Sequence, residues 1–195
     1  MSMKMTEDIK AWVAESVRVK QALLADEKTM NTIAEVAELL VRTYRAGGKT
    51  LWAGNGGSAA DAQHMAAELV NKFRLDREGL PAVALTANTS VVTAVGNDYG
   101  YDRLFVKQLE AFGRAGDVFI GISTSGNSAN LTAVVDYCRA HGIVTVALTG
   151  AAACGMDAYD HVIKVPSTET PRIQECQTLI GHILCGLVEQ SLFDK

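Results

Sequence analysis

The sequence predicts an α/β fold in which a five-stranded parallel sheet carries helices on both faces. Two observations predict this class. Five short apolar segments bounded by turn residues lie at 49–54, 81–87, 116–123, 142–150 and 161–165. Stretches with helical periodicity separate them, at 58–73, 89–95, 102–112 and 128–140. Strands that alternate with helices in this way form a parallel sheet between two helical layers.

Two helices are expected before this core. The first covers 6–24, with Thr6 as its N-cap and an apolar face made of Ile9, Trp12, Val13 and Val17. The second covers 27–46 and ends at Gly47 and Gly48. Its apolar stripe consists of Ile33, Val36, Ala37, Leu40, Val41 and Tyr44.

A long helix over 171–192 is expected after the core, with Thr170 as its cap and Pro171 in its first turn. The chain has 195 residues, which suits a single domain over 1–195. Within it, the N-terminal helices occupy about 6–46, the α/β core about 49–165 and the last helix about 171–192.

Composition narrows the classes of partner. Hydrophobic residues make up 48% of the chain and charged residues 21%, an ordinary globular balance. The net charge of −4 argues against a surface that binds nucleic acid. No apolar run approaches the ~20 residues of a membrane helix, and the start is too polar for a signal peptide. The four cysteines form no CxxC pair and are interpreted as reduced thiols of a cytoplasmic protein.

Five parallel strands in an open sheet most simply take the flavodoxin-like order 2-1-3-4-5. Ligands of such sheets bind beyond the carboxyl ends of the strands, where the order reverses between the first and third strands. The loops that follow these two strands are "GNGGS" (54–58) and "STSGNS" (123–128). The topology therefore predicts that the two loops are neighbours.

The second loop suggests a phosphate site. It offers the hydroxyls of four side chains around one glycine, and it leads into a helix. The four are Ser123, Thr124, Ser125 and Ser128. The simpler alternative is a solvated turn in which Asn127 or Ser128 caps the helix. Four hydroxyls at the switch point favour phosphate.

The first loop is more ambiguous. Gly54-x-Gly56-x-x-Ala59 matches a dinucleotide pattern, but the acid that would hold the ribose is missing from "LTANTS" (85–90). We prefer a close approach of bare backbone to a sugar or its phosphate. A tight turn capped by Ser58, with Asp61 three residues on, is the plainer interpretation.

His64 and Glu68 follow this loop at positions i and i+4, so their side chains are neighbours on one helix face. Such a pair can bind a metal, share a proton or form an exposed ion pair. The last helix adds Gln174 and His182. His141, at a helix C-terminus, and His161, at the start of a strand, are interpreted as structural.

Four motifs together resemble a known family. They are "GNGGSAADAQHMAAEL" (54–69), "VGNDYGYD" (95–102), "GISTSGNSAN" (121–130) and "PRIQECQTLIGHILCGLVEQSLF" (171–193). In this order they resemble the sugar-isomerase (SIS) fold and, within it, the bacterial sedoheptulose-7-phosphate isomerases, or phosphoheptose isomerases. The resemblance covers nearly the whole chain.

The resemblance implies an aldose–ketose isomerase that converts sedoheptulose 7-phosphate to D-glycero-D-manno-heptose 7-phosphate through an enediol. The product leads to ADP- or GDP-heptose and to lipopolysaccharide or surface polysaccharide. The resemblance also implies a cytoplasmic homotetramer with one zinc per subunit. The implied metal ligands are His64, Glu68, Gln174 and His182, and the implied proton-transfer pair is Glu68 and His182. The implied substrate contacts are Asn55, Gly56, Gly57, Glu68, Asn97, Asp98, Ser123, Thr124, Ser125, Ser128 and Gln174.

Two positions depart from the family pattern. Gln177 stands where many relatives have a second histidine, and Pro171 where some have an acid, so neither receives a role. Gln174 and His182 lie about 12 Å apart along a helix axis, which predicts that neighbouring chains share the site.

Other functions remain open at this point. They are another phosphosugar isomerase or epimerase, a dinucleotide enzyme, and a non-catalytic phosphosugar-binding regulator of the same fold that partners another protein such as a replication initiator. The dinucleotide enzyme is disfavoured by the missing acid. The presence of both Glu68 and His182 favours the isomerase over the regulator.

Overall fold

The computed structural model describes residues 2–194 and contains a parallel sheet in the order β2-β1-β3-β4-β5. The strands are β1 (Thr50–Gly54), β2 (Ala82–Ala84), β3 (Val118–Ile122), β4 (Val144–Thr149) and β5 (His161–Lys164). In the register, Trp52 pairs with Ile120 and Ile120 with Val146. The predicted fold class and strand order are confirmed.

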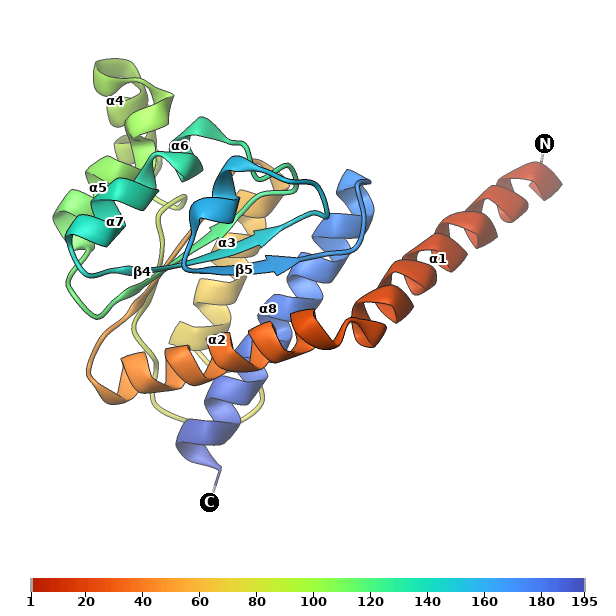
Figure 1. Ribbon diagram of the computed structural model, residues 1–195, viewed down its shortest axis with the longest axis horizontal. Coiled ribbons are helices and arrows are strands. Elements are labelled where there is room, and N and C mark those ends of the chain that lie inside the picture. Colours follow the sequence, from red (N-terminus) through yellow and green to blue (C-terminus); the bar gives the residue numbers. More distant parts are fainter. Residues whose placement is uncertain (1, 195) are drawn as a thin grey trace.

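Helices cover both faces of this sheet (Figure 1). Two precede it, α1 (Ser2–Ala25) and α2 (Glu27–Arg45), and α8 (Thr170–Phe193) follows it. The helices between the strands are α3 (Gly57–Val70), α4 (Thr89–Tyr99), α5 (Leu104–Phe112), α6 (Ala129–Thr132) and α7 (Val134–Ala140). Two short 3₁₀ helices, η1 (Tyr101–Arg103) and η2 (Gly155–Ala158), complete the described elements.

The strands divide the interior into two cores because successive side chains point to opposite faces. Trp52, Ile120 and Val146 face one core, which α2, α3 and α8 close. Leu51 and Phe119 face the other, closed mainly by α5 and α7. The sheet thus places α3 and α8 in the same layer.

The helix α2 forms as the sequence predicts. Asp26 caps it, because its carboxylate accepts hydrogen bonds from the backbone N–H of Thr29 at 3.1 Å and from the Thr29 hydroxyl at 2.7 Å. Its apolar stripe is buried. Gly47 then takes a φ of +79°, a left-handed conformation that glycine adopts without strain, and the helix ends.

Three predicted caps are wrong. Thr6 lies inside α1, because the helix already begins at Ser2. Thr170 is the first residue of α8 rather than its cap; the N-cap is Glu169 and Pro171 lies in the first turn, as expected. Ser58 lies inside α3, because Gly56 turns the chain at a φ of +55° and takes the N-cap position.

The predicted helix over 128–140 is divided into α6 and α7 at Ala133. Within α6 the hydroxyl of Thr132 donates to the carbonyl of Ala129 at 3.1 Å, a side-chain bond that competes with the helical ladder. Ser128 is the N-cap of α6 but makes no capping side-chain bond. Asn127 does not cap either, since its side-chain oxygen accepts from the N–H of Gly155 at 2.8 Å.

The helix α1 extends away from the body of the molecule (Figure 1). Its predicted apolar face is therefore largely uncovered within one chain, and the Trp12 side chain is 68% exposed. Ile9, Val13 and Val17 are exposed beside it. Among the described helices, none is both long enough and apolar enough to cross a membrane.

Candidate active site

The site is built on two helices, α3 and α8, that run side by side in the same direction. Successive turns of α3 therefore face successive turns of α8. Asp61 of α3 accepts a hydrogen bond from the Thr178 hydroxyl of α8 at 2.9 Å. One turn later, a Cβ on Gly181 would lie 2.3 Å from the sulfur of Met65. The bare backbone of Gly181 therefore lets the helices approach closely, which brings the adjacent histidines of the two helices together.

His64, Glu68 and His182 converge at this approach. His64 Nε2 lies 3.0 Å from a Glu68 carboxylate oxygen and 3.4 Å from His182 Nε2. One potential ligand atom from each residue lies within 4.8 Å of the other two. The His182 ring meets the His64 ring edge-on, at 84° with a centroid distance of 4.9 Å. A third donor from another helix makes this more than an ion pair along α3.

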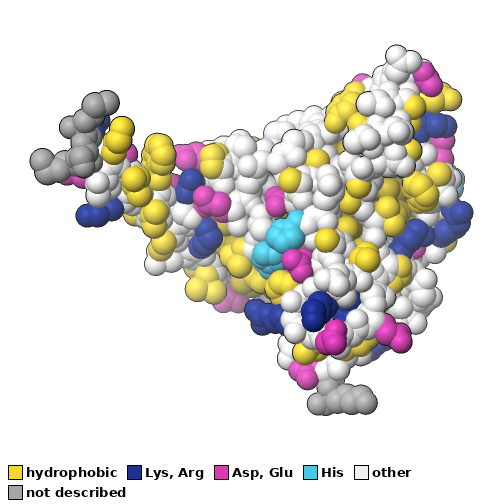
Figure 2. Space-filling model, turned by 180° about the vertical axis from the view of Figure 1, so that it is seen from behind, with side chains coloured by type: hydrophobic (Ala, Val, Ile, Leu, Met, Phe, Trp, Pro, Cys, Tyr) yellow, Lys and Arg dark blue, Asp and Glu magenta, His cyan; other side chains and the backbone are white. Residues whose placement is uncertain are grey.

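These donors fit a divalent metal such as zinc. Two imidazole nitrogens and one carboxylate oxygen are the donor types that catalytic zinc sites use, with a further position open to water or substrate. His64 is exposed, whereas Glu68 and His182 are half-buried. Figure 2 shows histidine side chains beside an acidic one on this face of the molecule, with hydrophobic side chains close by.

The His182 ring also has an aromatic neighbour on its face. Phe73 stacks on it, with a centroid distance of 5.3 Å and an interplanar angle of 21°. The guanidinium of Arg74 lies over the Phe73 ring, 5.3 Å from its centroid. Phe73 was not expected from the sequence; the available signal was an aromatic residue inside the mostly charged turn "NKFRLDREG" (71–79).

The loop 123–128 is a tight turn with its hydroxyls at the carboxyl edge of the sheet. The Ser123 hydroxyl accepts from the N–H of Gly126 at 3.1 Å and lies 3.3 Å from the Ser128 hydroxyl. Gly126 has a φ of +66°, and a Cβ there would lie 2.2 Å from the Cys154 sulfur. Ser125 is exposed and Thr124 half-buried, so both can meet a ligand.

The two loops are neighbours, as the topology predicted. The Asn55 side chain of the first loop exchanges hydrogen bonds of 3.0 and 2.9 Å with the side chain of Asn130 in α6, the helix that follows the second loop. The Tyr101 hydroxyl donates to the Asn55 oxygen at 3.0 Å. Neither Asn130 nor Tyr101 was expected from the sequence to contribute, although both lie within the quoted motifs.

Gln174 lies at the first loop. Its amide nitrogen is 2.7 Å from where a Cβ on Gly57 would be. The structure therefore does not bring Gln174 to His64 and His182 within one chain, since it precedes His182 on α8 by about 12 Å along the axis. Its predicted metal contact remains a prediction.

Asn97 and Asp98 lie on α4, where the Asn97 amide donates to the Asp98 carboxylate at 2.7 Å. Across residues 2–194, no side-chain hydrogen bond joins either residue to the two loops. His141 and His161 have the expected places, at the C-terminus of α7 and the start of β5.

Comparison with known proteins agrees with the class that this fold and site define, a SIS-domain protein. A family model of the SIS domain matches residues 11–150. A phosphoheptose isomerase from Aneurinibacillus thermoaerophilus is 54% identical over 190 residues, which cover 97% of this chain and 96% of that protein. A "Phosphoheptose isomerase 2" from Campylobacter jejuni is 51% identical over 188 residues, or 96% of this chain and 94% of that one.

The solved structure of a phosphoheptose isomerase from Neisseria gonorrhoeae superposes with a TM-score of 0.89 at 43% identity, covering 95% of this chain and 99% of that chain. The chain belongs to the phosphoheptose isomerase family. The predicted family and the predicted class of enzyme, an aldose–ketose isomerase, are confirmed.

Proposed function

We propose that the chain interconverts sedoheptulose 7-phosphate and D-glycero-D-manno-heptose 7-phosphate, toward ADP- or GDP-heptose and surface polysaccharide. The observation that carries this proposal is the convergence of His64, Glu68 and His182 in a chain about half identical to named phosphoheptose isomerases. The carboxylate and imidazole supply a base and an acid within a few ångströms of each other, which is what moving a proton between two adjacent carbons requires.

Glu68 acts as the base in this proposal. Its carboxylate removes a proton from C1 of the ketose while the oxygen on C2 takes a proton from His182, which gives the 1,2-enediol. Deprotonation of the oxygen on C1 and return of a proton to C2 then give the aldose. The sum is a shift of hydrogen between C1 and C2, with no external oxidant or reductant.

The substrate phosphate binds the hydroxyl loop. Ser125 is exposed, Thr124 and Ser128 are half-buried, and Ser123 is buried with its hydroxyl 3.3 Å from that of Ser128. Asn55, Gly56 and Gly57 present backbone and amide groups to the sugar, with Gln174 alongside. Binding of the phosphate holds C1 and C2 of the substrate in place, although the phosphate itself does not react. Asn97 and Asp98 are proposed further contacts.

His64, Glu68 and His182 would hold the zinc that the family resemblance implies. Proton transfer by Glu68 and His182 would then use the atom that the metal leaves free, the second carboxylate oxygen of Glu68 and the second ring nitrogen of His182. When bound there, zinc would polarise the substrate carbonyl and stabilise the negative charge that develops on the enediol oxygens. Because Gln174 lies about two turns away in the same chain, we propose that it reaches the metal from a neighbouring copy.

The distance between the two parts of the site supports a shared active site. From Gly57 to Glu68 the helix α3 rises by about 16 Å. An extended chain advances by about 1.2 Å per bond, so C2 and the phosphorus of a heptose 7-phosphate, about seven bonds apart, are at most about 8 Å apart. We therefore propose a homotetramer in which the loops of one copy face the His–Glu–His group of another.

The exposed apolar face of α1 is the surface that we propose for this assembly. Trp12, Ile9 and Val13 would be covered there by another copy. We also propose that the protein works in the cytoplasm, where thiols stay reduced, because its four cysteines are free.

A direct assay tests the proposed function. Purified protein is given sedoheptulose 7-phosphate, with and without a zinc chelator, and the aldose is measured. We expect turnover that the chelator abolishes and added Zn²⁺ restores. Absence of turnover in protein that is folded and loaded with zinc would contradict the proposal.

A further inference from the structure

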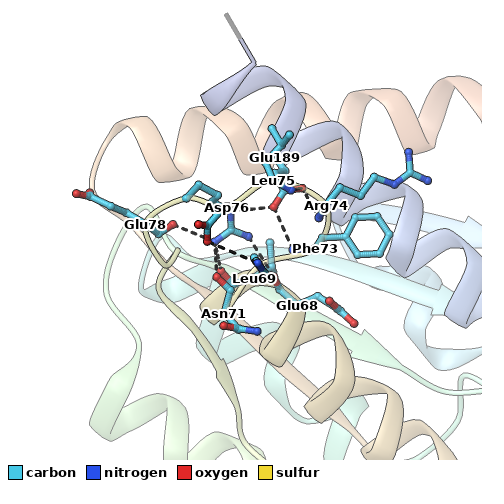
Figure 3. A network of polar contacts seen from close by, with 11 residues as sticks. Glu68, Leu69, Asn71, Phe73, Arg74, Leu75, Asp76, Glu78 and Glu189 are labelled. Carbon is cyan, nitrogen blue, oxygen red and sulfur yellow. Dashed lines mark hydrogen bonds and ion pairs between the residues drawn. The ribbon is translucent and has the colours of Figure 1, made fainter.

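A buried carboxylate on α8 binds one loop by several bonds at once. Glu189 is 1% exposed, and both of its oxygens are saturated (Figure 3). One oxygen accepts from the N–H of Phe73 at 3.1 Å and from Arg77 Nε at 3.0 Å. The other accepts from the N–H groups of Arg74 and Leu75 at 2.7 and 2.9 Å. The loop from α3 to β2 is thus fixed to α8 at one residue.

Arg77, which forms an ion pair with Glu189, caps the C-terminus of α3, the helix that carries Glu68. The Arg77 guanidinium donates to the carbonyl of Leu69 at 2.7 Å and to the carbonyl of Glu68 at 3.1 Å. It also donates to the carbonyl of Glu78 at 3.0 Å. The last carbonyls of a helix have no partner within it, so Arg77 supplies what the end of α3 lacks. The last turn of α3 is thereby tied to Glu189.

The first of the three loop residues whose N–H groups bind Glu189 reaches the site itself. Phe73, whose N–H is held by Glu189, stacks on the face of His182 while His64 meets the edge of the same ring. Gly186 lies beside this stack, since a Cβ there would be in ordinary van der Waals contact with the Phe73 ring, at 3.4 Å. The orientation of His182 therefore depends on where the loop is held.

We propose that Glu189, Arg77 and Phe73 are positioning residues that set the orientation of His182 and the place of Glu68. We call the three residues the Glu189 anchor. Glu189 follows His182 by about two helical turns, so both lie on one side of α8, and the anchor links that helix to the end of α3. The expected effects on turnover rest on the proposed function, whereas those on His182 geometry do not.

A buried ion pair is weak evidence of a role in stability, because apolar residues of similar volume often stabilise a fold as well or better. The contacts of these residues instead support a role in orienting His182 and in placing Glu68. Groups that orient metal or catalytic ligands typically change metal affinity or activity by 10- to 100-fold when they are replaced.

Three variants and one control test the anchor. Phe73→Leu removes the ring but keeps an apolar side chain, and Phe73→Tyr restores a ring. Glu189→Gln keeps the size of the side chain but removes its charge and one acceptor. The control is Asp117→Asn. Asp117 is also buried, and it accepts from the N–H groups of Lys49 and Arg114 and from the Lys49 ammonium. It has no hydrogen bond to the anchor.

The first measurement is NMR of the four histidines in metal-free protein, with His182→Gln used only to assign the His182 signal. The Phe73 ring shifts the His182 ring protons upfield. We expect Phe73→Leu and Glu189→Gln to lose this shift, and Phe73→Tyr and Asp117→Asn to keep it. The second measurement is titration with Zn²⁺ alone, where the first two variants should bind at least about tenfold more weakly.

Steady-state kinetics with sedoheptulose 7-phosphate complete the test. In the same two variants we expect kcat to fall about 10- to 100-fold while KM stays within about twofold, and Phe73→Tyr should recover most of kcat. An unchanged His182 signal and unchanged Zn²⁺ affinity in Phe73→Leu and Glu189→Gln would overturn the anchor, as would the same losses in Asp117→Asn. Wild-type protein that binds Zn²⁺ but turns nothing over would overturn the proposed function instead, and the NMR and Zn²⁺ results would still decide the anchor.

Discussion

The side-chain amide of Gln174 occupies the space that a side chain on Gly57 would need, 2.7 Å from the position of its Cβ. The glycine loop and the last helix therefore meet through an amide and a bare backbone. This contact places Gln174, within its own chain, beside the glycine loop that we propose binds the sugar.

Gly57→Ala tests this contact. The added methyl group displaces the flexible end of Gln174, so we expect substrate to bind about tenfold more weakly while the fold remains intact. Affinity for the sugar phosphate is measured by calorimetry and stability by thermal unfolding. The control is Gly96→Ala on α4, where a Cβ would have nothing within 4 Å. Equal affinity in the Gly57 variant and the wild type would remove Gln174 from the substrate site.

Ser125→Ala and Ser128→Ala test the phosphate loop. Losing one hydrogen bond to a charged group costs about 1.5–3 kcal/mol, which corresponds to a 10- to 100-fold loss of affinity. We expect this loss for sedoheptulose 7-phosphate, with little change in thermal unfolding. Titration of the folded variants measures it. Binding as tight as in the wild type would exclude the loop from the site.

Glu68→Gln tests the base. The amide keeps the shape but not the basicity, and general-base catalysis contributes about 10²–10⁴-fold, so turnover should fall by at least about 100-fold. Substrate affinity should change far less, because the proposed phosphate site is the loop 123–128 and not Glu68. Turnover, affinity and bound zinc are measured on one preparation. Glu110→Gln, at an exposed residue paired with Lys107 on α5, is the control. Near-normal turnover in Glu68→Gln would mean that the base is another residue.

Glu189 predicts a pH dependence of stability. Burial alone would raise the pKa of its carboxyl, but the N–H groups of Leu75, Phe73 and Arg74 and the charge of Arg77 outweigh burial and lower it below the usual 4.5. The group therefore stabilises the fold fully above pH 4.5, and this contribution is lost as the pH falls through the lowered pKa.

Glu189→Gln should consequently destabilise the protein by about 3–5 kcal/mol at pH 7, because the Arg77 charge is left buried and unpaired. The difference in unfolding free energy between the wild type and the variant should shrink below pH 4.5. Urea unfolding at several pH values measures it. A difference that stays constant down to acid pH would show that the carboxylate charge does not stabilise the fold.

Trp12→Glu tests the proposed assembly. A carboxylate on the exposed apolar face of α1 cannot be buried without a large cost, so we expect a smaller particle in sedimentation and loss of turnover. Each copy should remain folded, because Trp12 is outside both cores. Glu7→Gln, on the same helix, is the control. Full activity in a monomer would contradict the shared site.

The parts of the fold that the sequence predicted are those governed by a local rule. The strand segments and α2 follow from short-range periodicity, and the meeting of the two loops follows from the strand order. Caps depend on details that periodicity does not contain. Gly56 moved the start of α3 by turning the chain at a positive φ, and no pattern distinguished it from Ser58 as a cap.

The candidate site was predictable where residues share a helix. His64 and Glu68 are one turn apart, so their proximity required no tertiary information. The proximity of His182 depends on the packing of α3 against α8, which periodicity does not predict. His182 was assigned to the site only through the family resemblance. Glu189 and Phe73 are separated by more than one hundred residues, and no motif joins them, because Glu189 lies in the last quoted motif and Phe73 outside all four. Only the folded structure could bring them together.

The common direction of α3 and α8 gives the site an electrostatic polarity. The backbone dipoles of a helix sum to roughly half a positive charge at its N-terminus and half a negative charge at its C-terminus. Two such N-termini lie together at the end where Gly57 meets Gln174, whereas Glu68 lies in the last turn of α3. The backbone of this helix pair therefore favours an anion at one end, and α3 favours a cation at the other. In the proposed shared site, the end of one copy that favours an anion would face the end of another copy that favours a cation, which suits a sugar phosphate beside a divalent metal before any side chain contributes.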